Sequence, residues 1–238
     1  MNSGFTYKLY SDDDMEKFVK DYYPDLFGGY ALLRPIQRSD FFRYLILYHE
    51  GGYYADCDVY CNLPITIWPR IFELQEPLGF ICGLEMIVDV SKPDWKQWWA
   101  REYQITQWTF ASAPGHGILR VSIDKILSYI NKYGPKIVQT GPILRSTGPG
   151  IWSDAIREFV ELNYDVKFGS GELTPEGFKH KGHQIGDIAI LSTDAFGFHS
   201  ARARQSRAEL ILVQHQFQGS WKYNGWDKNE KTPKTPTK

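Results

Sequence analysis

The sequence predicts a single α/β domain. Its 238 residues are enough for one sizeable domain with its own core. Apolar, strand-like runs alternate along the chain with segments of helical period, which is the pattern of an α/β architecture. Apolar residues make up 42% and charged residues 23%, as in a folded soluble protein. No internal repeat or change of composition indicates a second domain.

The first elements are expected to be a strand and a helix. Residues 5–10 are predicted as the first strand. Ser11 is predicted to cap a helix whose first turn contains Asp12, Asp13 and Asp14, where the helix dipole favours carboxylates. Apolar residues at positions 15, 18, 19 and 22 form its buried face, and Pro24 is expected to end it. Residues 28–37 are predicted as a connecting loop.

The central stretch is predicted to be a buried helix followed by a short strand. Ser39 is the expected cap, Asp40 lies in the first turn, and apolar residues recur at helical spacing through position 48. Gly51-Gly52 is expected to end the helix. Residues 53–55 then form a strand, with Asp56 and Asp58 at its exit.

This exit has the chemistry of a cation site. Side chains two residues apart on extended backbone point the same way, so Asp56 and Asp58 can share a divalent cation. Asp40 and Arg43 are one helical turn apart and suit a sugar and a diphosphate respectively. The alternative is a polar turn beside a local ion pair, and a bare Asp-x-Asp is too short to decide.

The middle of the chain continues the alternation. A strand is predicted at 79–85, a second at 105–113, and a helix after the turn at 114–117. The tryptophan-rich residues 92–101 form either a platform for an acceptor sugar or one side of an amphipathic helix packed on the sheet, and the general weakness of aromatic clusters as site signals favours packing. His116 lies in the turn, where a lone histidine is more often structural.

The last third contributes further candidate residues. Ser153 is predicted to cap a helix, with Asp154 either contacting a sugar hydroxyl or serving the helix dipole. Strands are predicted at 187–191 and 210–213. His215 follows the second strand and can act as a third metal ligand. Ser220, Trp221 and Lys222 are donors suited to a diphosphate, although a strand end with a buried aromatic is the simpler interpretation of residues 214–222 taken alone.

Bulk properties exclude some function classes. The formal net charge is −1 and the sequence pI is about 6.6, which argues against a protein that binds nucleic acid or anionic membranes. No apolar run is long enough to span a bilayer, and no signal-peptide pattern opens the chain. The 3 cysteines fit neither a disulfide framework nor a zinc site.

The motifs together resemble a known family. The pattern Ser-Asp-x-x-Arg-Tyr-x-x-Leu-x-x-x-Gly-Gly-x-Tyr-x-Asp-x-Asp-Val, residues 39–59, is similar to the sugar-nucleotide-binding signature of DXD-containing glycosyltransferases. More narrowly, the chain resembles the fungal initiating α-1,6-mannosyltransferase group of glycosyltransferase family 32. The resemblance covers nearly the whole chain and continues through residues 107–108, 113–116, 147–154, 184–187 and 214–222.

The resemblance implies a fold and its boundaries. It implies a GT-A-like domain over residues 1–226, with a mostly parallel twisted sheet and helices on both faces. Ligands of such sheets sit at the carboxyl ends of the strands, where Asp56 and Asp58 are expected. The strand that usually opens the family domain is not visible, so the chain is expected to start inside the domain. Residues 227–238, within a Lys-, Thr- and Pro-rich end, are expected to be a disordered tail.

The resemblance also implies an activity and its residues. It implies a retaining transfer of mannose from GDP-mannose to a glycan acceptor in protein N-glycosylation, within the Golgi and in a mannosyltransferase complex. Mn²⁺ or another divalent cation would be held by Asp56, Asp58 and His215. The donor phosphates would contact Arg43 and residues 220–222. Asp40 would hold donor-sugar hydroxyls, and Gln107 and Asp154 would lie near the substrates.

Two rival interpretations remain. Asp56-Cys-Asp-Val also fits the nucleophile motif of haloacid-dehalogenase-type phosphotransferases, but the sequence has no Gly-Asp-x-x-x-Asp pair for their magnesium. The second rival is a non-catalytic or degenerate sugar-nucleotide-binding domain that lacks the first strand. Turnover of a nucleotide sugar separates it from an active transferase.

Overall fold

The computed structural model describes residues 2–171, 173–178, 182–197 and 211–218. The longer helices are α1 (Asp12–Tyr22), α2 (Pro24–Ala31), α3 (Pro35–Glu50), α5 (Gly117–Thr140) and α7 (Pro149–Tyr164), with short helices α4 (Trp68–Ile71), α6 (Ile143–Ser146), η1 (Ile65–Ile67) and η2 (Trp95–Gln97). The strands are β1 (Gly52–Ala55), β2 (Val59–Cys61), β3 (Phe80–Ile87), β4 (Tyr103–Ile105), β5 (Thr109–Ser112), β6 (His183–Ile185), β7 (Ile188–Leu191), β8 (Phe196–Gly197) and β9 (Val213–His215).

The strands form two sheets. The larger has the order β1-β5-β3-β7-β6, with β4 also paired to β3, and the smaller has the order β2-β9-β8. In the larger sheet β3 and β7 are parallel, whereas the β1/β5, β3/β5, β3/β4 and β6/β7 pairs are antiparallel. The predicted α/β class is therefore confirmed, but the expectation of a mostly parallel sheet is wrong. Hydrophobic periodicity indicates a strand and carries no information on its direction.

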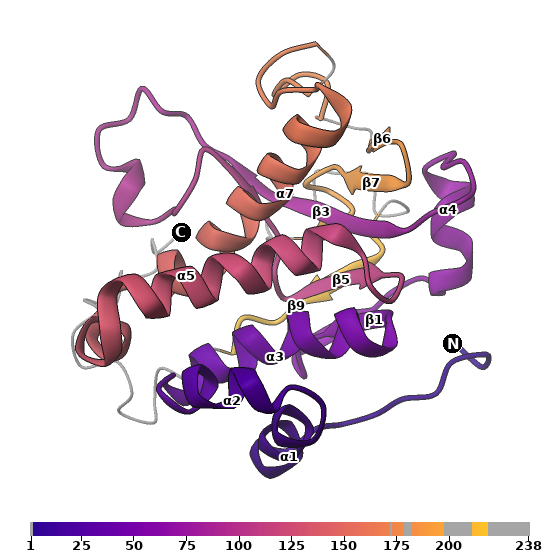
Figure 1. Ribbon diagram of the computed structural model, residues 1–238. Coiled ribbons are helices and arrows are strands. Elements are labelled where there is room, and N and C mark those ends of the chain that lie inside the picture. Colours follow the sequence, from indigo (N-terminus) through magenta and orange to yellow (C-terminus); the bar gives the residue numbers. More distant parts are fainter. Residues whose placement is uncertain (1, 172, 179–181, 198–210, 219–238) are drawn as a thin grey trace.

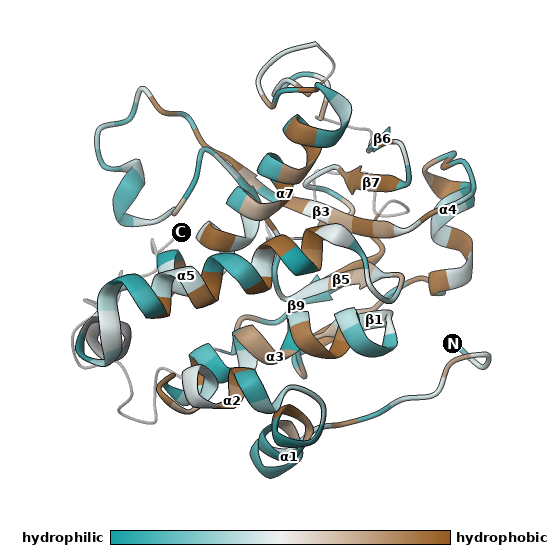
Figure 2. Ribbon diagram, viewed as in Figure 1, coloured by the Kyte–Doolittle hydropathy of each residue, from teal (hydrophilic) through white to brown (hydrophobic). Residues whose placement is uncertain are grey.

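Alternation along the strands separates two cores. Residues at even positions of the central strands pack beneath α3, α5 and α7: Tyr54, Phe80, Cys82, Leu84, Phe110, Ile188 and Ile190. Odd positions pack on the other side with Trp68 of α4 and Val213 of β9: Tyr53, Ile81, Ala189 and Leu191. Long helices thus cover one face (Figure 1), and the smaller sheet with α4 covers the other, where the expectation was helices on both faces. Polar residues face outward along α1 and α5 (Figure 2).

Several predicted boundaries move because proline begins helices here. Pro24 and Pro35 are the first residues of α2 and α3, a position that suits a residue with fixed φ and no N–H. The predicted loop at 28–37 is therefore mostly helical. Ser39 lies inside α3, and its predicted role as a cap is wrong because Arg34 is the N-cap. Residues 5–10 form no strand, and Tyr22 is exposed.

The sheet brings two strand ends to one edge. Both β1 and β3 are antiparallel to β5, which lies between them, so they run in the same direction. Their carboxyl ends therefore lie at the same edge, with Asp56 directly after β1. Among the described residues, the structure contains no helix with the length and apolar character needed to cross a membrane.

Candidate metal and substrate site

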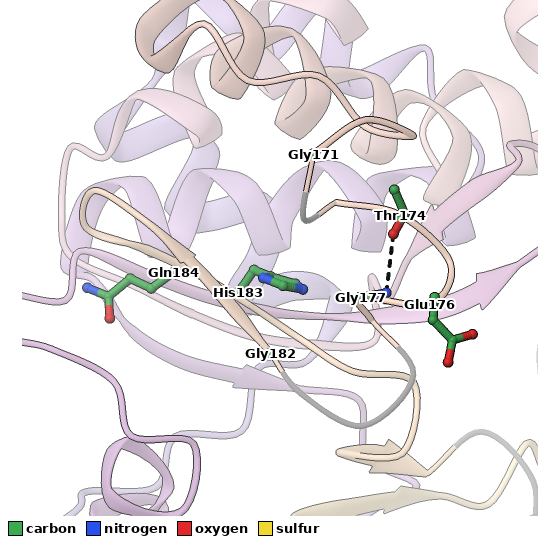
Figure 3. A pocket seen from close by; sticks show the side chains of 7 residues that line it. All are labelled: Gly171, Thr174, Glu176, Gly177, Gly182, His183 and Gln184. Atoms are coloured by element: carbon green, nitrogen blue, oxygen red, sulfur yellow. Dashed lines mark hydrogen bonds between the residues drawn. The ribbon is translucent and has the colours of Figure 1, made fainter.

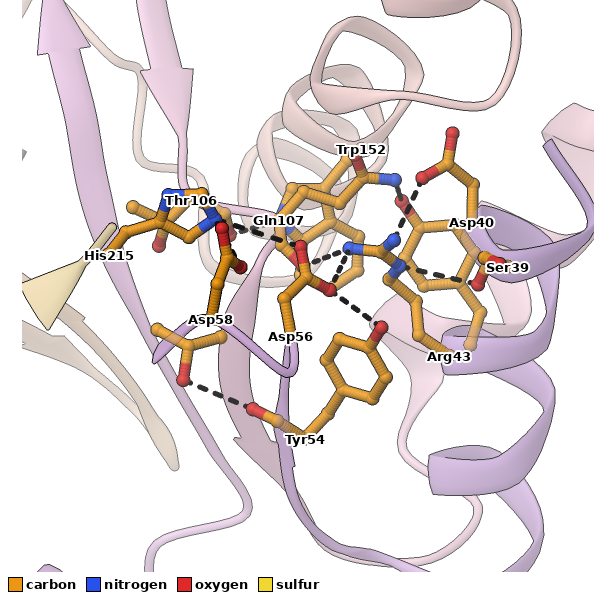
Figure 4. A network of polar contacts seen from close by, with 12 residues as sticks. Ser39, Asp40, Arg43, Tyr54, Asp56, Asp58, Thr106, Gln107, Trp152 and His215 are labelled. Atoms are coloured by element: carbon orange, nitrogen blue, oxygen red, sulfur yellow. Dashed lines mark hydrogen bonds and ion pairs between the residues drawn. The ribbon is translucent and has the colours of Figure 1, made fainter. Parts of the chain in front are cut away.

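Three side chains converge after β1. Gly51, with a φ of 69°, turns the chain from α3 into β1, and a Cβ at this position would lie 2.6 Å from Pro114. β9 pairs with β2 so that His215 lies opposite Val59, beside Asp58. The ligand atoms of Asp56, Asp58 and His215 all lie within 4.8 Å of one another. Figure 4 shows the three side chains pointing toward one another.

The donor set fits a divalent cation. Two carboxylates and an imidazole suit manganese-type ions better than a soft metal. Burial alone would raise the pKa of Asp56, but Arg43 and hydrogen bonds with His215 and Tyr54 bring it below its ordinary value, so the carboxylate is held ionised. The Tyr54 hydroxyl donates to Asp56 Oδ1 over 2.7 Å.

The His215 ring carries a constraint on metal binding. Its Nδ1 accepts a hydrogen bond from the Phe217 N–H over 2.9 Å, and its Nε2 lies 3.3 Å from Asp58 Oδ1. In a neutral ring these contacts place the proton on Nε2. A cation bound through Nε2 therefore requires the proton to move to Nδ1 and the Phe217 N–H to move away. The Gln218 N–H also bonds Asp58 Oδ2 over 3.0 Å, so residues 216–218 are tied to the aspartate.

Arg43 is buried behind Asp56. Its Nη1 lies 3.3 Å from Asp56 Oδ1 and donates to the Gln107 carbonyl over 2.9 Å, and its Nη2 lies 3.0 Å from Asp40 Oδ1. Its Nε donates to the Ser39 carbonyl over 3.4 Å. Four of the five guanidinium donors are thus used within the protein. Arg43 lies between the two aspartates (Figure 4), so it orients Asp56.

Asp40 and Gln107 belong to the same buried network. Asp40 Oδ2 accepts from the Thr147 hydroxyl over 2.8 Å. Burial raises the pKa of Asp40 to about 6, against the lowering effects of Arg43 and Thr147. Gln107 Nε2 donates to the Tyr44 hydroxyl over 2.6 Å and to the Thr147 carbonyl over 2.9 Å. The structure thus brings Asp40, Arg43 and Gln107 together with Asp56, and joins them to the loop that precedes α7.

Other predicted candidates lie apart from this network. Asp154 is inside α7, beyond its first turn, and both its oxygens bind Arg101, the Nε contact being 2.6 Å. His116 lies 3.5 Å from Asp187 and stacks on Phe80 at the start of β3, which is the opposite end of the sheet from Asp56. Ser220, Trp221 and Lys222, like the predicted tail at 227–238, lie outside the described residues.

The tryptophan-rich segment does not form a helix packed on the sheet. It is a loop between β3 and β4 that contains the short helix η2. Trp98 is 41% exposed, and Trp95 and Trp99 are half-buried. Because the loop follows the carboxyl end of β3, it lies at the same edge of the sheet as Asp56. The favoured interpretation, packing as an amphipathic helix, is wrong.

One buried residue beside this site was not predicted from the sequence. Glu85 in β3 is a buried carboxylate that receives a 2.7 Å hydrogen bond from Gln104 Nε2. Burial raises its pKa to about 7. A charged residue within the otherwise apolar run 80–87 was the available signal. Thr147 begins the segment 147–154 that contributes to the family resemblance, but its hydrogen bond with Asp40 joins residues 107 positions apart and was not predicted.

A separate hollow is lined by Gly171, Thr174, Glu176, Gly177, Gly182, His183 and Gln184 (Figure 3). Its volume is about 600 Å³. None of the predicted site residues lines it, and it lies beside β6 at the edge of the sheet opposite to β1. The chemistry therefore gathers at Asp56 and not in this hollow.

Comparison with known proteins identifies relatives of the chain. Residues 2–75 match the family described as glycosyltransferase sugar-binding region containing DXD motif. The chain is 35% identical to an initiation-specific alpha-1,6-mannosyltransferase of Schizosaccharomyces pombe, over 82% of the chain and 49% of the relative. Proteins of the same description are 30% identical in Candida albicans (96% of the chain, 66% of the relative) and in Saccharomyces cerevisiae (74% and 40%). The chain thus spans between 40 and 66% of the length of these relatives.

Proposed function

The chain belongs to the family of glycosyltransferases whose sugar-binding region contains a DXD motif, and from this premise we propose that it transfers mannose from GDP-mannose to a glycan. The observation that carries the proposal is the convergence of Asp56 and Asp58 with His215, which lies far away in the sequence. An Asp-x-Asp with a third ligand beside it is a cation site at the strand ends, where α/β proteins bind nucleotides.

We propose that Asp56, Asp58 and His215 hold a divalent cation, with Mn²⁺ as the expected ion. Bound there, the cation would neutralise the negative charge that builds up on the departing diphosphate. In the transfer, the bond between the sugar C1 and the diphosphate oxygen breaks and a bond from C1 to an acceptor hydroxyl oxygen forms. The hydroxyl proton leaves with the diphosphate. Retention of the anomeric configuration is part of the proposal.

The chain's own residues orient the reactants. Arg43 orients the Asp56 carboxylate. One guanidinium N–H has no partner among the described residues, and we propose that it contacts a donor phosphate. Asp40 and Gln107 both contact Arg43 and are proposed to lie beside the donor sugar. Ser220, Trp221 and Lys222 follow His215 and are proposed to contact the diphosphate. For Asp154 the bidentate pair with Arg101 favours a structural role over a sugar contact.

The wider setting is proposed from the relatives. We propose a GT-A-like domain, a role in protein N-glycosylation within the Golgi, and association with other mannosyltransferases. The initiation-specific alpha-1,6-mannosyltransferases that the chain resembles over most of its length support the mannosyltransferase part of this proposal.

The test is a panel of GDP- and UDP-sugars with a mannose oligosaccharide acceptor, with and without Mn²⁺. Turnover of GDP-mannose that requires Mn²⁺ is expected. D56A and D58A should abolish turnover and weaken Mn²⁺ binding by calorimetry while remaining folded. D13A, which removes an exposed aspartate of α1, is the matched control and should leave both unchanged.

Two results would contradict the proposal. Full activity in D56A or D58A would exclude the cation role of these residues. Binding of GDP-mannose by the folded wild-type protein without any turnover would instead identify a binding domain.

A further inference from the structure

The loop between β3 and β4, residues 88–102, presents an aromatic ring to solvent at the edge of the sheet where Asp56 lies. Of its three tryptophans, Trp98 is 41% exposed, whereas Trp95 and Trp99 are half-buried. The Lys96 ammonium lies 5.4 Å from the centroid of the Trp95 ring and so covers one face of that ring. Trp98 is therefore the tryptophan of this loop that is best placed to stack on a ligand.

The loop is held at its base and along its length. The Val88 N–H donates to the Glu102 carbonyl over 2.8 Å and closes the base. Farther along the loop, the Lys96 carbonyl accepts a hydrogen bond from Arg145 Nη2 of α6 over 3.2 Å. A loop held in this way presents Trp98 in a fixed position, so little conformational entropy is lost when a ligand stacks on the ring.

The start of α7 connects this loop to the residues beside the cation site. The Thr147 hydroxyl, just before α7, donates to Asp40 over 2.8 Å. Three residues later, a Cβ at Gly150 would lie 3.0 Å from the Cβ of Ala100, so glycine at this position lets the loop pack closely against the helix. Figure 1 shows the loop beside the first turns of α7. The loop and the cation site therefore share one support.

The charges of the loop balance. It contains three basic and three acidic residues: Lys92, Lys96, Arg101, Asp89, Asp94 and Glu102. A phosphate or an anionic membrane surface is bound by a surplus of basic residues, which this loop does not have. The exposed polar side chains of Asp94 and Gln97 flank the ring of Trp98 in the sequence. An apolar ring face beside such hydrogen-bonding groups suits a neutral sugar, which has both an apolar face and hydroxyls.

We propose that Trp98 stacks on a sugar of the acceptor glycan other than the one that reacts, an inference that rests on the proposed transferase function. The reacting hydroxyl has to lie at the cation site, after β1. The loop follows β3, and β5 lies between these two strands. Neighbouring strands are about 4.8 Å apart, so the two strand ends are separated by about 10 Å. The loop is thus positioned for a second sugar, and it sets the length of acceptor that the protein prefers.

The experiment measures transfer from GDP-mannose to mannose oligosaccharides of increasing length, beside hydrolysis of GDP-mannose without acceptor. With the wild type, KM for the acceptor should fall with length and level off once a sugar reaches Trp98. W98A should raise KM for the long acceptors about 3- to 10-fold, remove the dependence on length, and leave kcat and donor hydrolysis unchanged. W98F keeps an aromatic ring and should restore most of the dependence.

Y7A is the matched control. Tyr7 is 80% exposed, so Y7A also removes an exposed aromatic ring. It belongs to the segment before α1, which lies on the opposite side of the molecule from the loop in Figure 1. Y7A should keep the wild-type dependence of KM on acceptor length. Both Y7A and W98A should unfold at the urea concentration of the wild type, because neither ring is buried.

The possible results are distinct. With an active wild type, the same dependence of KM on length in W98A and wild type overturns the proposal and leaves the proposed function intact, and so does an equal change in Y7A. A wild type that turns over no donor counts against the proposed function, and ligand-observed NMR with the longest oligosaccharide then decides the subsite. Binding that is lost in W98A and kept in Y7A supports it, and equal or absent binding in wild type and W98A overturns it.

A membrane surface is the other class of partner that the experiment tests. Vesicles of phosphatidylcholine and phosphatidylserine are sedimented with the wild type and with W98A. We expect no binding by either protein. Binding by the wild type that is lost in W98A, without binding of the oligosaccharide, would assign the loop to a membrane surface and overturn the proposal.

Discussion

The pH dependence of unfolding offers a direct test of the environment of Glu85. Burial raises the pKa of this carboxyl from 4.5 to about 7 in the folded protein. Folding therefore favours the protonated form. The free energy of unfolding contributed by Glu85 is fully present below pH 4.5 and is lost as the pH rises towards 7. Replacement by neutral glutamine removes this dependence.

The magnitude follows from the two pKa values. One pKa unit corresponds to about 1.4 kcal/mol, so a shift from 4.5 to about 7 amounts to roughly 3 kcal/mol at most. Part of this loss of stability has already occurred at pH 5, because a glutamate of the unfolded chain is partly ionised at that pH. Between pH 5 and pH 8 the stability of E85Q relative to wild type should rise by about 2.5 kcal/mol, and it should level off above pH 7.

The assay is urea unfolding followed by tryptophan fluorescence at pH 5, 6, 7 and 8, at constant ionic strength and with EDTA present. E102Q, measured in the same way, corrects for the loss of a surface glutamate. A difference between wild type and E85Q that does not change with pH would show that Glu85 ionises equally in folded and unfolded protein. The reasoning from burial would then be refuted.

Three further predictions concern the site and the loop between β3 and β4. R43K keeps the charge, but a lysine cannot bind Asp40, Asp56 and the Gln107 carbonyl together. The free energy of unfolding, measured by urea titration, should therefore fall by about 2 kcal/mol. An unchanged value would show that the three contacts of the guanidinium do not stabilise the fold. H215A should weaken Mn²⁺ binding by calorimetry at least about 10-fold in a folded protein, and unchanged affinity would remove His215 from the ligand set. W98A should raise KM for a mannose oligosaccharide more than for a monosaccharide, and equal changes would exclude stacking on the loop.

Local chemistry explains which elements the sequence predicted well. Ser11 and Asp14 form a capping box within four residues, and α1 begins at Asp12 as expected. Gly51 adopts the positive φ that ends α3, because glycine carries no Cβ. The start of α3 was not predicted correctly, because the helix begins at Pro35, before the expected cap at Ser39. Strand direction depends on pairing partners far along the chain, so no local pattern contains it.

The candidate site was predictable to the extent that it is a motif. Asp56 and Asp58 are two residues apart in the sequence, and together with the helix pattern that precedes them they indicate a shared cation. His215 came from the chemistry of a strand end together with the family resemblance. The partner of Asp154 was not predictable, because Arg101 reaches it from a loop 53 residues away. Glu85 was not predicted as a site residue, because the burial of its carboxylate depends on residues that pack around it only in the folded sheet.

His215 joins β9, the central strand of the smaller sheet, to the two aspartates at the end of β1. Any cation bound there therefore links two parts of the polypeptide that are remote along the chain, and its binding free energy adds to the free energy of unfolding. A hundredfold excess over the dissociation constant adds about 2.7 kcal/mol. The melting temperature thus becomes a measure of ion occupancy that needs neither donor nor acceptor.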